Sequence, residues 1–163
     1  MPTDSTINGQ KIEKDNLIFE VLGCLDRASV EIGSAKLIAE NEISQILTQI
    51  QNHLANFSSF IAGYNGQGVS PRMVAGTDSS EVERRLNWLD KQIQSFESKI
   101  DIPRKFVLSG DSELEVRLNL ARVSVRKTER RVISLNRYQD LPREMLDYLN
   151  RLSWLLFLLA INH

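Results

Sequence analysis

Arginine is the residue type in this chain whose spacing could do chemistry. Arg122, Arg126 and Arg130 recur every four residues, so on a helix their guanidinium groups lie on one side and two of them can hold one polyphosphate. The stretch 117–137 contains six arginines and Lys127 against a single acid, Glu129, which gives it a net charge of +6. The whole chain has a net charge of −1. The positive charge is therefore concentrated in one segment of an otherwise acidic protein.

These arginines lie beside an expected core, and this position limits the partners that their guanidinium groups can have. Apolar spacings of three and four predict one buried helical face, made of Leu114, Leu118, Ala121, Val125, Thr128, Val132 and Leu135. Arg122 and Arg126 belong to the adjacent column, at the edge of that face. Guanidinium groups in such a place are partly desolvated and need anionic partners. Asp26 lies at the edge of a similar apolar face in the segment 18–39, and it is the candidate partner of Arg122.

Three interpretations of this basic column remain open at this point. It could be the solvated or internally paired face of an amphipathic helix, a contact for nucleic acid, or the site of a small anionic ligand. Nucleic acid is the least favoured ligand, because no aromatic residues interleave with the arginines and the rest of the chain is acidic.

Composition excludes several other classes of protein. With 163 residues, 42% of them hydrophobic and 25% charged, the chain has the composition of an ordinary globular domain. Its single cysteine, Cys24, cannot form an intrachain disulfide, and His53 and His163 lie too far apart to show a metal-ligand spacing. The longest apolar run, 154–161, is too short to span a bilayer, and the first residues lack a signal-peptide pattern. We therefore expect a cytoplasmic protein with no membrane partner.

The elements that must position the arginines are predicted to be helices. Apolar periodicity, with breaks at glycine and proline, predicts no strand and five helices, at 15–39, 42–63, 80–99, 112–136 and 142–161. Capping-box spacings at Ser80 and Ser112 support two of the helix starts. Short connections predict antiparallel neighbours. We expect an all-α fold, a five-helix up-and-down bundle, as one domain over 1–163 with a flexible segment at 1–14.

The arginine segment and the last predicted helix resemble one enzyme family. The sequences are LNLARVSVRKTERRVISL at 118–135 and YLNRLSWLLFLLA at 148–160. They resemble the ATP:cob(I)alamin adenosyltransferases of the propanediol-utilisation type, whose motifs read L-H-x-A-R-T-x-x-R-R-A-E-R-R-V and N-R-L-S-D. KFVLSGD at 105–111 is similar to the family's F-[IV]-L-P-G-G, and weaker agreement runs through 9–14 and 23–26.

The resemblance implies a fold, an activity and an assembly. It implies a homotrimer of five-helix bundles with active sites between subunits. The substrates would be ATP, carrying Mg²⁺, and a corrinoid in the cob(I)alamin state, and the products adenosylcobalamin and triphosphate. Because cobalt itself is the nucleophile, no general base and no metal ligand from the protein are needed. The protein has to position two reactants and neutralise a leaving triphosphate.

The resemblance also assigns residues to the ATP site. Arg126 would hold the triphosphate, and Glu129 and Arg130 would complete that site. Lys14 would reach the phosphates, and Asn150 would contact the nucleoside.

Two further roles follow from the same resemblance. Arg122 would pair with Asp26 across the subunit boundary, and Phe106 would face the corrin and help to exclude its lower axial ligand. Some of these positions have structural alternatives. Phe106 equally fits a core aromatic, Asn150 fits a polar group between helices, and Lys14 fits an exposed residue near a helix start.

The chain departs from the family pattern at several positions. The family begins with a phosphate-binding stretch, T-x-T-G-D-x-G-x-T, whereas this chain has only MPTDSTIN before Gly9. Asn119, Lys127 and Trp154 replace a histidine, an arginine and an aspartate of the motifs. Two functions therefore remain in view. One is an adenosyltransferase, and the alternative is a non-catalytic trimeric homologue that binds a corrinoid, a nucleotide or a protein partner.

Overall fold

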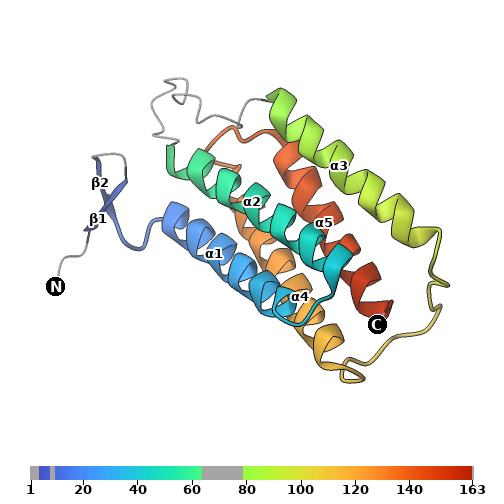
Figure 1. Ribbon diagram of the computed structural model, residues 1–163. Coiled ribbons are helices and arrows are strands. Elements are labelled where there is room, and N and C mark those ends of the chain that lie inside the picture. Colours follow the sequence, from blue (N-terminus) through green and yellow to red (C-terminus); the bar gives the residue numbers. More distant parts are fainter. Residues whose placement is uncertain (1–3, 8–9, 64–78, 163) are drawn as a thin grey trace.

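Helices dominate the computed structural model, which describes residues 4–7, 10–63 and 79–162. In these residues the chain forms five helices, preceded by two short strands (Figure 1). The helices are α1 (Leu17–Lys36), α2 (Asn41–Gly63), α3 (Ser79–Glu97), α4 (Glu113–Leu135) and α5 (Arg143–Ile161), and the strands are β1 (Asp4–Ile7) and β2 (Gln10–Glu13). The five predicted helices and the all-α bundle are confirmed. The loop predicted after Gly63 lies outside the described residues.

The segment before α1 corrects one prediction. No strand was expected there, but β1 and β2 pair antiparallel, with Asp4 opposite Glu13 and Ile7 opposite Gln10. The sequence does contain a signal for this hairpin, because Asn-Gly at 8–9 is the dipeptide most typical of a two-residue hairpin turn. A search for helical periodicity overlooks such short strands.

The helices alternate in direction along the chain, as an up-and-down bundle requires, but one pair of packed helices is parallel. α1 packs against α2 and α4, and α4 packs against α5. α3 packs against α5 and runs in the same direction, since Asp90 and Glu97 of α3 bond to Arg151 and Trp154 of α5 in the same order (Figure 1). Because α4 lies between them in the chain, this parallel packing agrees with the alternating directions of an up-and-down bundle. The connection 98–112 carries the chain across the end of the bundle before α4 begins (Figure 1).

The predicted apolar faces of α1 and α4 meet in the core. Thr128, the one polar residue on the α4 face, is fully buried. Its hydroxyl lies 3.0 Å from the Cys24 carbonyl of α1 and 2.9 Å from the Ser124 carbonyl of its own helix. An ion pair between Arg131 and Glu20, at 2.8 Å, joins the same two helices. α4 is therefore held in one register against α1. This register fixes the side of α4 on which the column of Arg122 and Arg126 lies.

A buried polar cluster joins α2, α3 and α5. His53 Nδ1 lies 2.8 Å from the Tyr148 hydroxyl, and its Nε2 lies 3.0 Å from Gln49 Nε2. Trp88 packs edge-on against the imidazole, with ring centroids 5.1 Å apart. Burial, together with the positive charge of Arg85, lowers the pKa of His53 to about 4. The imidazole is therefore neutral at pH 7.

The connection before α4 is held by Glu115. Ser112 caps the helix, its hydroxyl accepting from the Glu115 N–H at 3.1 Å. The Glu115 carboxylate, only 6% exposed, accepts from the Ser109 hydroxyl at 2.7 Å, from the Gly110 N–H at 2.8 Å and from Asn119 Nδ2 at 2.5 Å. Burial acts to raise the pKa of Glu115, but these hydrogen bonds outweigh it and the pKa is lowered. Gly110 has φ +138°, a conformation that L side chains rarely adopt.

We predict that His53 makes folding stability depend on pH. Between its unfolded pKa of 6.5 and its folded pKa of about 4, the unfolded state binds a proton that the folded state does not. The free energy of unfolding should therefore fall as pH falls through this window, by about 2 kcal/mol between pH 7 and pH 4.5. Urea denaturation of the native protein and of His53→Gln at both pH values isolates the contribution of His53 to the free energy of unfolding. Equal pH dependence in the two proteins would contradict the assignment.

We predict a large stability difference between two glutamates of the first turn of α4. Glu115→Ala removes the acceptor of three donors and should lower the free energy of unfolding by about 3 kcal/mol. Glu113 is exposed and pairs only with Arg117 at the surface, so Glu113→Ala should cost less than about 1 kcal/mol. Chemical denaturation followed by helical circular dichroism measures both. Similar costs for the two variants would mean that Glu115 does not hold the connection.

Candidate functional site

Two hollows in the surface share the side chain of Arg122. The first has a volume of about 460 Å³ and lies between α4 and α5. Its lining residues are Arg122, Arg126, Asn150, Ser153, Trp154 and Phe157. We call it the arginine hollow. The second, also about 460 Å³, lies between α4 and the connection 98–112, and Phe106, Leu108, Leu120, Arg122 and Val123 are among its lining residues. We call it the phenylalanine hollow.

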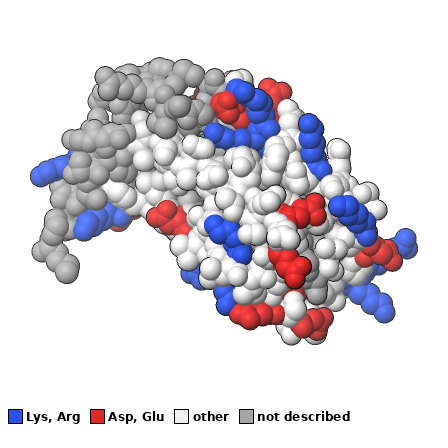
Figure 2. Space-filling model, in the orientation of Figure 1, with Lys and Arg blue, Asp and Glu red and all other residues white. Residues whose placement is uncertain are grey.

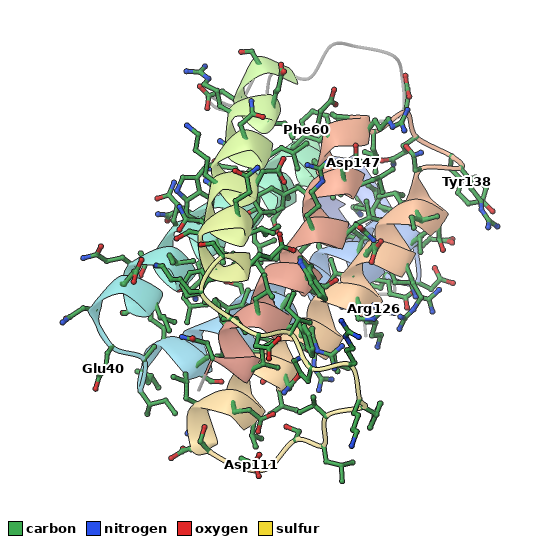
Figure 3. All side chains as sticks on the ribbon, turned by 90° about the vertical axis from the view of Figure 1, so that its right-hand side faces the viewer. Glu40, Phe60, Asp111, Arg126, Tyr138 and Asp147 are labelled. Carbon is green, nitrogen blue, oxygen red and sulfur yellow. The ribbon has the colours of Figure 1, made fainter. Side chains whose placement is uncertain are left out.

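The α4 side of the arginine hollow is cationic. Arg126 projects about midway along α4, between Asp111 before the helix and Tyr138 beyond its end (Figure 3). Arg122 lies one turn earlier. In the part of the chain that the structure describes, neither guanidinium forms an ion pair with a carboxylate. Two such groups, four residues apart on a helix and lining one hollow, form a suitable site for a polyphosphate.

Arg122 is oriented by a chain of hydrogen bonds that begins at the connection 98–112. Its Nε donates to Asn119 Oδ1 at 2.9 Å, and Asn119 in turn donates to the buried Glu115. Burial and the adjacent Arg126 charge lower the pKa of Arg122. Both effects disfavour a positive charge at this position, and an anion bound in the hollow would offset them.

The α5 side of the arginine hollow contributes an amide. Asn150 Nδ2 donates to Glu129 Oε1 of α4 at 2.9 Å. Glu129 does not line the hollow itself, and it acts on the site by holding the Asn150 side chain. The remaining oxygen of the Asn150 amide can serve a ligand.

Aromatic residues complete the α5 side. Trp154 stacks on Phe157, with ring centroids 5.3 Å apart and planes 27° apart, and its indole N–H donates to Glu97 Oε1 at 2.7 Å. Sequence reasoning noted Trp154 only as a departure from the family motif and did not place it in the site. The spacing of Asn150, Trp154 and Phe157 puts them on one face of a helix, and this was the signal that could have found them.

Phe106 lies at the surface of the protein. It is 92% exposed on the connection 98–112 and lines the phenylalanine hollow. The alternative interpretation of Phe106 as a core aromatic is therefore wrong. Its position depends on the bonds from Ser109 and Gly110 to Glu115, which fix the end of this connection on α4.

Three other predicted site residues are not brought to the hollows. Asp26 is exposed on α1, Lys14 is exposed between β2 and α1, and Arg130 is exposed on α4; none of them lines either hollow. Within the described residues of this single chain, Arg122 bonds to Asn119, and no ion pair joins it to Asp26. The resemblance places that pair between two subunits.

The site offers positive charge, one amide and aromatic surface, and it offers few metal ligands. Among the described residues, no group of three or more His, Cys, Asp and Glu side chains is arranged to hold a metal ion. The described helices also include none that is long and apolar enough to cross a membrane. On the face shown in Figure 2, basic and acidic side chains are interspersed and do not form one basic field.

Comparison with known sequences agrees with this chemistry. The family model for cobalamin adenosyltransferase matches residues 3–163. The corrinoid adenosyltransferase PduO of Citrobacter freundii is 28% identical over 159 residues, which cover 97% of this chain and 46% of that protein. The corrinoid adenosyltransferase of Bacillus subtilis is 30% identical over 152 residues, covering 89% of this chain and 73% of that protein. The chain thus spans about half the length of the Citrobacter protein.

Solved structures share the fold. A variant of a PduO-type adenosyltransferase from Lactobacillus reuteri, complexed with ATP, has a TM-score of 0.83 at 22% identity and covers 98% of this chain and 88% of its own. A second variant of the Lactobacillus protein, complexed with cobalamin and ATP, has a TM-score of 0.82, also at 22% identity, and covers 98% of this chain and 87% of its own. Because the family model matches nearly the whole chain, the protein belongs to the cobalamin adenosyltransferase family.

Proposed function

We propose that this chain transfers the 5′-deoxyadenosyl group of ATP to cob(I)alamin, giving adenosylcobalamin and triphosphate. The observation that carries the proposal is the side chain of Arg122, which lines both the arginine hollow and the adjoining phenylalanine hollow. The arginine hollow suits the triphosphate and nucleoside of ATP, and the phenylalanine hollow suits the apolar face of a corrin. Family membership and the names of the relatives support the same activity.

The reaction determines what the protein has to supply. A bond forms between cobalt and C5′, the bond between C5′ and the α-phosphate oxygen breaks, and its electron pair leaves on triphosphate. Since cobalt provides the attacking electron pair, no side chain has to remove a proton. The contributions left to the protein are the alignment of two substrates and stabilisation of the charge that develops on the leaving oxygen.

Residues that line the arginine hollow, and others beside it on α4, divide these tasks. Arg126 binds the triphosphate and stabilises it as it leaves, and Arg130 adds positive charge one turn further along α4. Asn150, held by Glu129, orients the nucleoside. Mg²⁺ would arrive with ATP, since this ion is commonly held by substrate phosphates with only one or two carboxylates. The lack of a three-ligand cluster in the described residues is compatible with that arrangement.

Phe106 has a different task. An exposed aromatic ring next to Leu108 and Leu120 offers an apolar surface to the corrin and keeps a lower axial ligand away from cobalt. We place the reaction in the cytoplasm, because the Co(I) state requires a reducing compartment.

We further propose that the protein is a homotrimer with its active sites between subunits. Asp26 forms no ion pair within the described chain, and its neighbour on α1, Val30, is 71% exposed. On α4, Val123 is 56% exposed beside Arg122. A second copy that covers these apolar side chains would bring a carboxylate to Arg122 and Lys14 to the phosphates. Both residues lie away from the hollows of their own subunit.

A second candidate function is supported by the segment before α1. Residues 4–7 and 10–13 form a hairpin in the part of the chain where the family has its phosphate-binding stretch. A chain without those phosphate contacts could bind a corrinoid, a nucleotide or a protein partner without catalysis.

Turnover distinguishes the two functions. We expect anaerobically generated cob(I)alamin and Mg-ATP to yield the absorption spectrum of the cobalt–carbon bond. Arg126→Ala should lower the rate at least about a hundredfold, because a group that stabilises the leaving charge is lost. Lys127→Ala is the matched control, since Lys127 is an exposed neighbour that lines neither hollow, and its rate should be unchanged.

Each result in this assay has a defined meaning. Circular dichroism must show the same helical content in both variants. No turnover by the native protein at millimolar ATP would establish the non-catalytic alternative. An unchanged rate in Arg126→Ala would refute the role of that residue.

We predict a trimer whose assembly depends on Asp26 and Arg122. Light scattering should give a mass of about three times 18.6 kDa. Asp26→Arg should shift the mass towards the monomer, because two like charges then meet, and adding Arg122→Asp should restore the trimer. Arg27→Ala is the control, since Arg27 pairs with Glu31 of its own helix. A native monomer, or a trimer unaffected by Asp26→Arg, would contradict the proposed contact.

A further inference from the structure

Trp154 gives the arginine hollow a feature that neither the phosphate chemistry nor the family motif explains. It is one of two tryptophans in the chain, it stands where the motif has an aspartate, and it is 37% exposed. It lines the same hollow as Arg122 and Arg126. A large aromatic side chain at the wall of a cationic hollow is unnecessary for binding triphosphate alone.

The orientation of the indole is fixed from two sides. Phe157 stacks on one face of the ring, and Glu97 of α3 accepts the indole N–H. The exposed area of Trp154 therefore belongs to the remaining face and edges. A ring that is already held in place loses little conformational entropy when a ligand stacks on it.

The two sides of the hollow match the two ends of a nucleotide. Guanidinium groups on α4 suit phosphate oxygens, and an aromatic face on α5 suits a nucleobase, which stacks on such rings. Asn150, one turn before Trp154, adds a polar group on the α5 side. We propose that Trp154 is the stacking surface for the adenine base of ATP, an inference that rests on the proposed function and extends it to base recognition.

A stacked base would contribute to the affinity for ATP in addition to the phosphate contacts. Purine nucleotides should then bind more tightly than pyrimidine nucleotides, because a larger ring system covers more of the indole.

Fluorescence tests whether the base reaches the ring. In Trp88→Phe, Trp154 is the only tryptophan, so indole emission reports on the hollow. Mg-ATP should quench or shift this emission with a saturating dependence on concentration, and tripolyphosphate, which has no base, should leave it nearly unchanged. Emission that ATP does not alter, or that tripolyphosphate alters equally, would overturn the proposal.

Affinity measurements separate stacking from a structural role. By calorimetry, Trp154→Leu should weaken Mg-ATP binding about tenfold or more and leave tripolyphosphate binding unchanged, whereas Trp154→Phe should stay close to the native affinity. Trp154 is partly exposed, so both variants are expected to fold. Equal weakening for ATP and tripolyphosphate would mean that Trp154 only supports the hollow.

The outcome for Trp154 is distinguishable from that for the proposed function. ATP binding that depends on Trp154, without transfer to cob(I)alamin, would refute the enzyme activity and support base stacking. If the Trp154→Leu variant binds ATP with the native affinity and still transfers the adenosyl group, the result would support the activity and refute base stacking.

Discussion

The half-buried guanidinium of Arg122 is the constraint on which the rest of the site depends. The adjacent residues Leu118, Ala121 and Val125 are fully buried, so Arg122 is held at the edge of the core wherever α4 packs on α1. Burial and the neighbouring Arg126 both act against its charge. The core thus supports an electrostatically unfavourable arrangement, which an anion bound in the hollow would relieve. Because such a ligand binds the folded state only, it should also stabilise the fold.

The second hollow is a consequence of topology. Since α3 packs on α5, the chain has to cross the end of the bundle before α4 can begin beside α1. This crossing is the connection 98–112, and it carries Phe106 past the first turns of α4. Glu115 holds its end and, through Asn119, also orients Arg122. One buried carboxylate therefore links the position of the connection that carries Phe106 to the position of Arg122.

The parts of this arrangement that the sequence predicts are those that depend on local pattern. The faces of α1 and α4 follow from apolar spacing, and the arginine column follows from its place beside them. The choice of α5 as the helix on which α3 packs has no local signal, because it depends on contacts between residues about 60 apart, such as Asp90 and Arg151. Glu115 looks like an ordinary capping residue of a first turn, and only the fold shows that it is buried. Asp26 forms no ion pair within the described residues of one chain, and the proposal that its partner lies in another subunit comes from the resemblance alone.

In the proposed reaction, the two sides of the arginine hollow would contribute differently. Contacts to the triphosphate strengthen as negative charge moves onto the leaving oxygen, so Arg122 and Arg126 can lower the barrier to the reaction. Contacts to the base are equally strong before and during the reaction, so Trp154 can improve the binding of ATP without accelerating its cleavage. An aromatic wall of this kind would therefore improve the retention of ATP more than its activation. The strength of the arginine contacts to the triphosphate then decides whether this chain acts as an enzyme or as a non-catalytic nucleotide-binding protein.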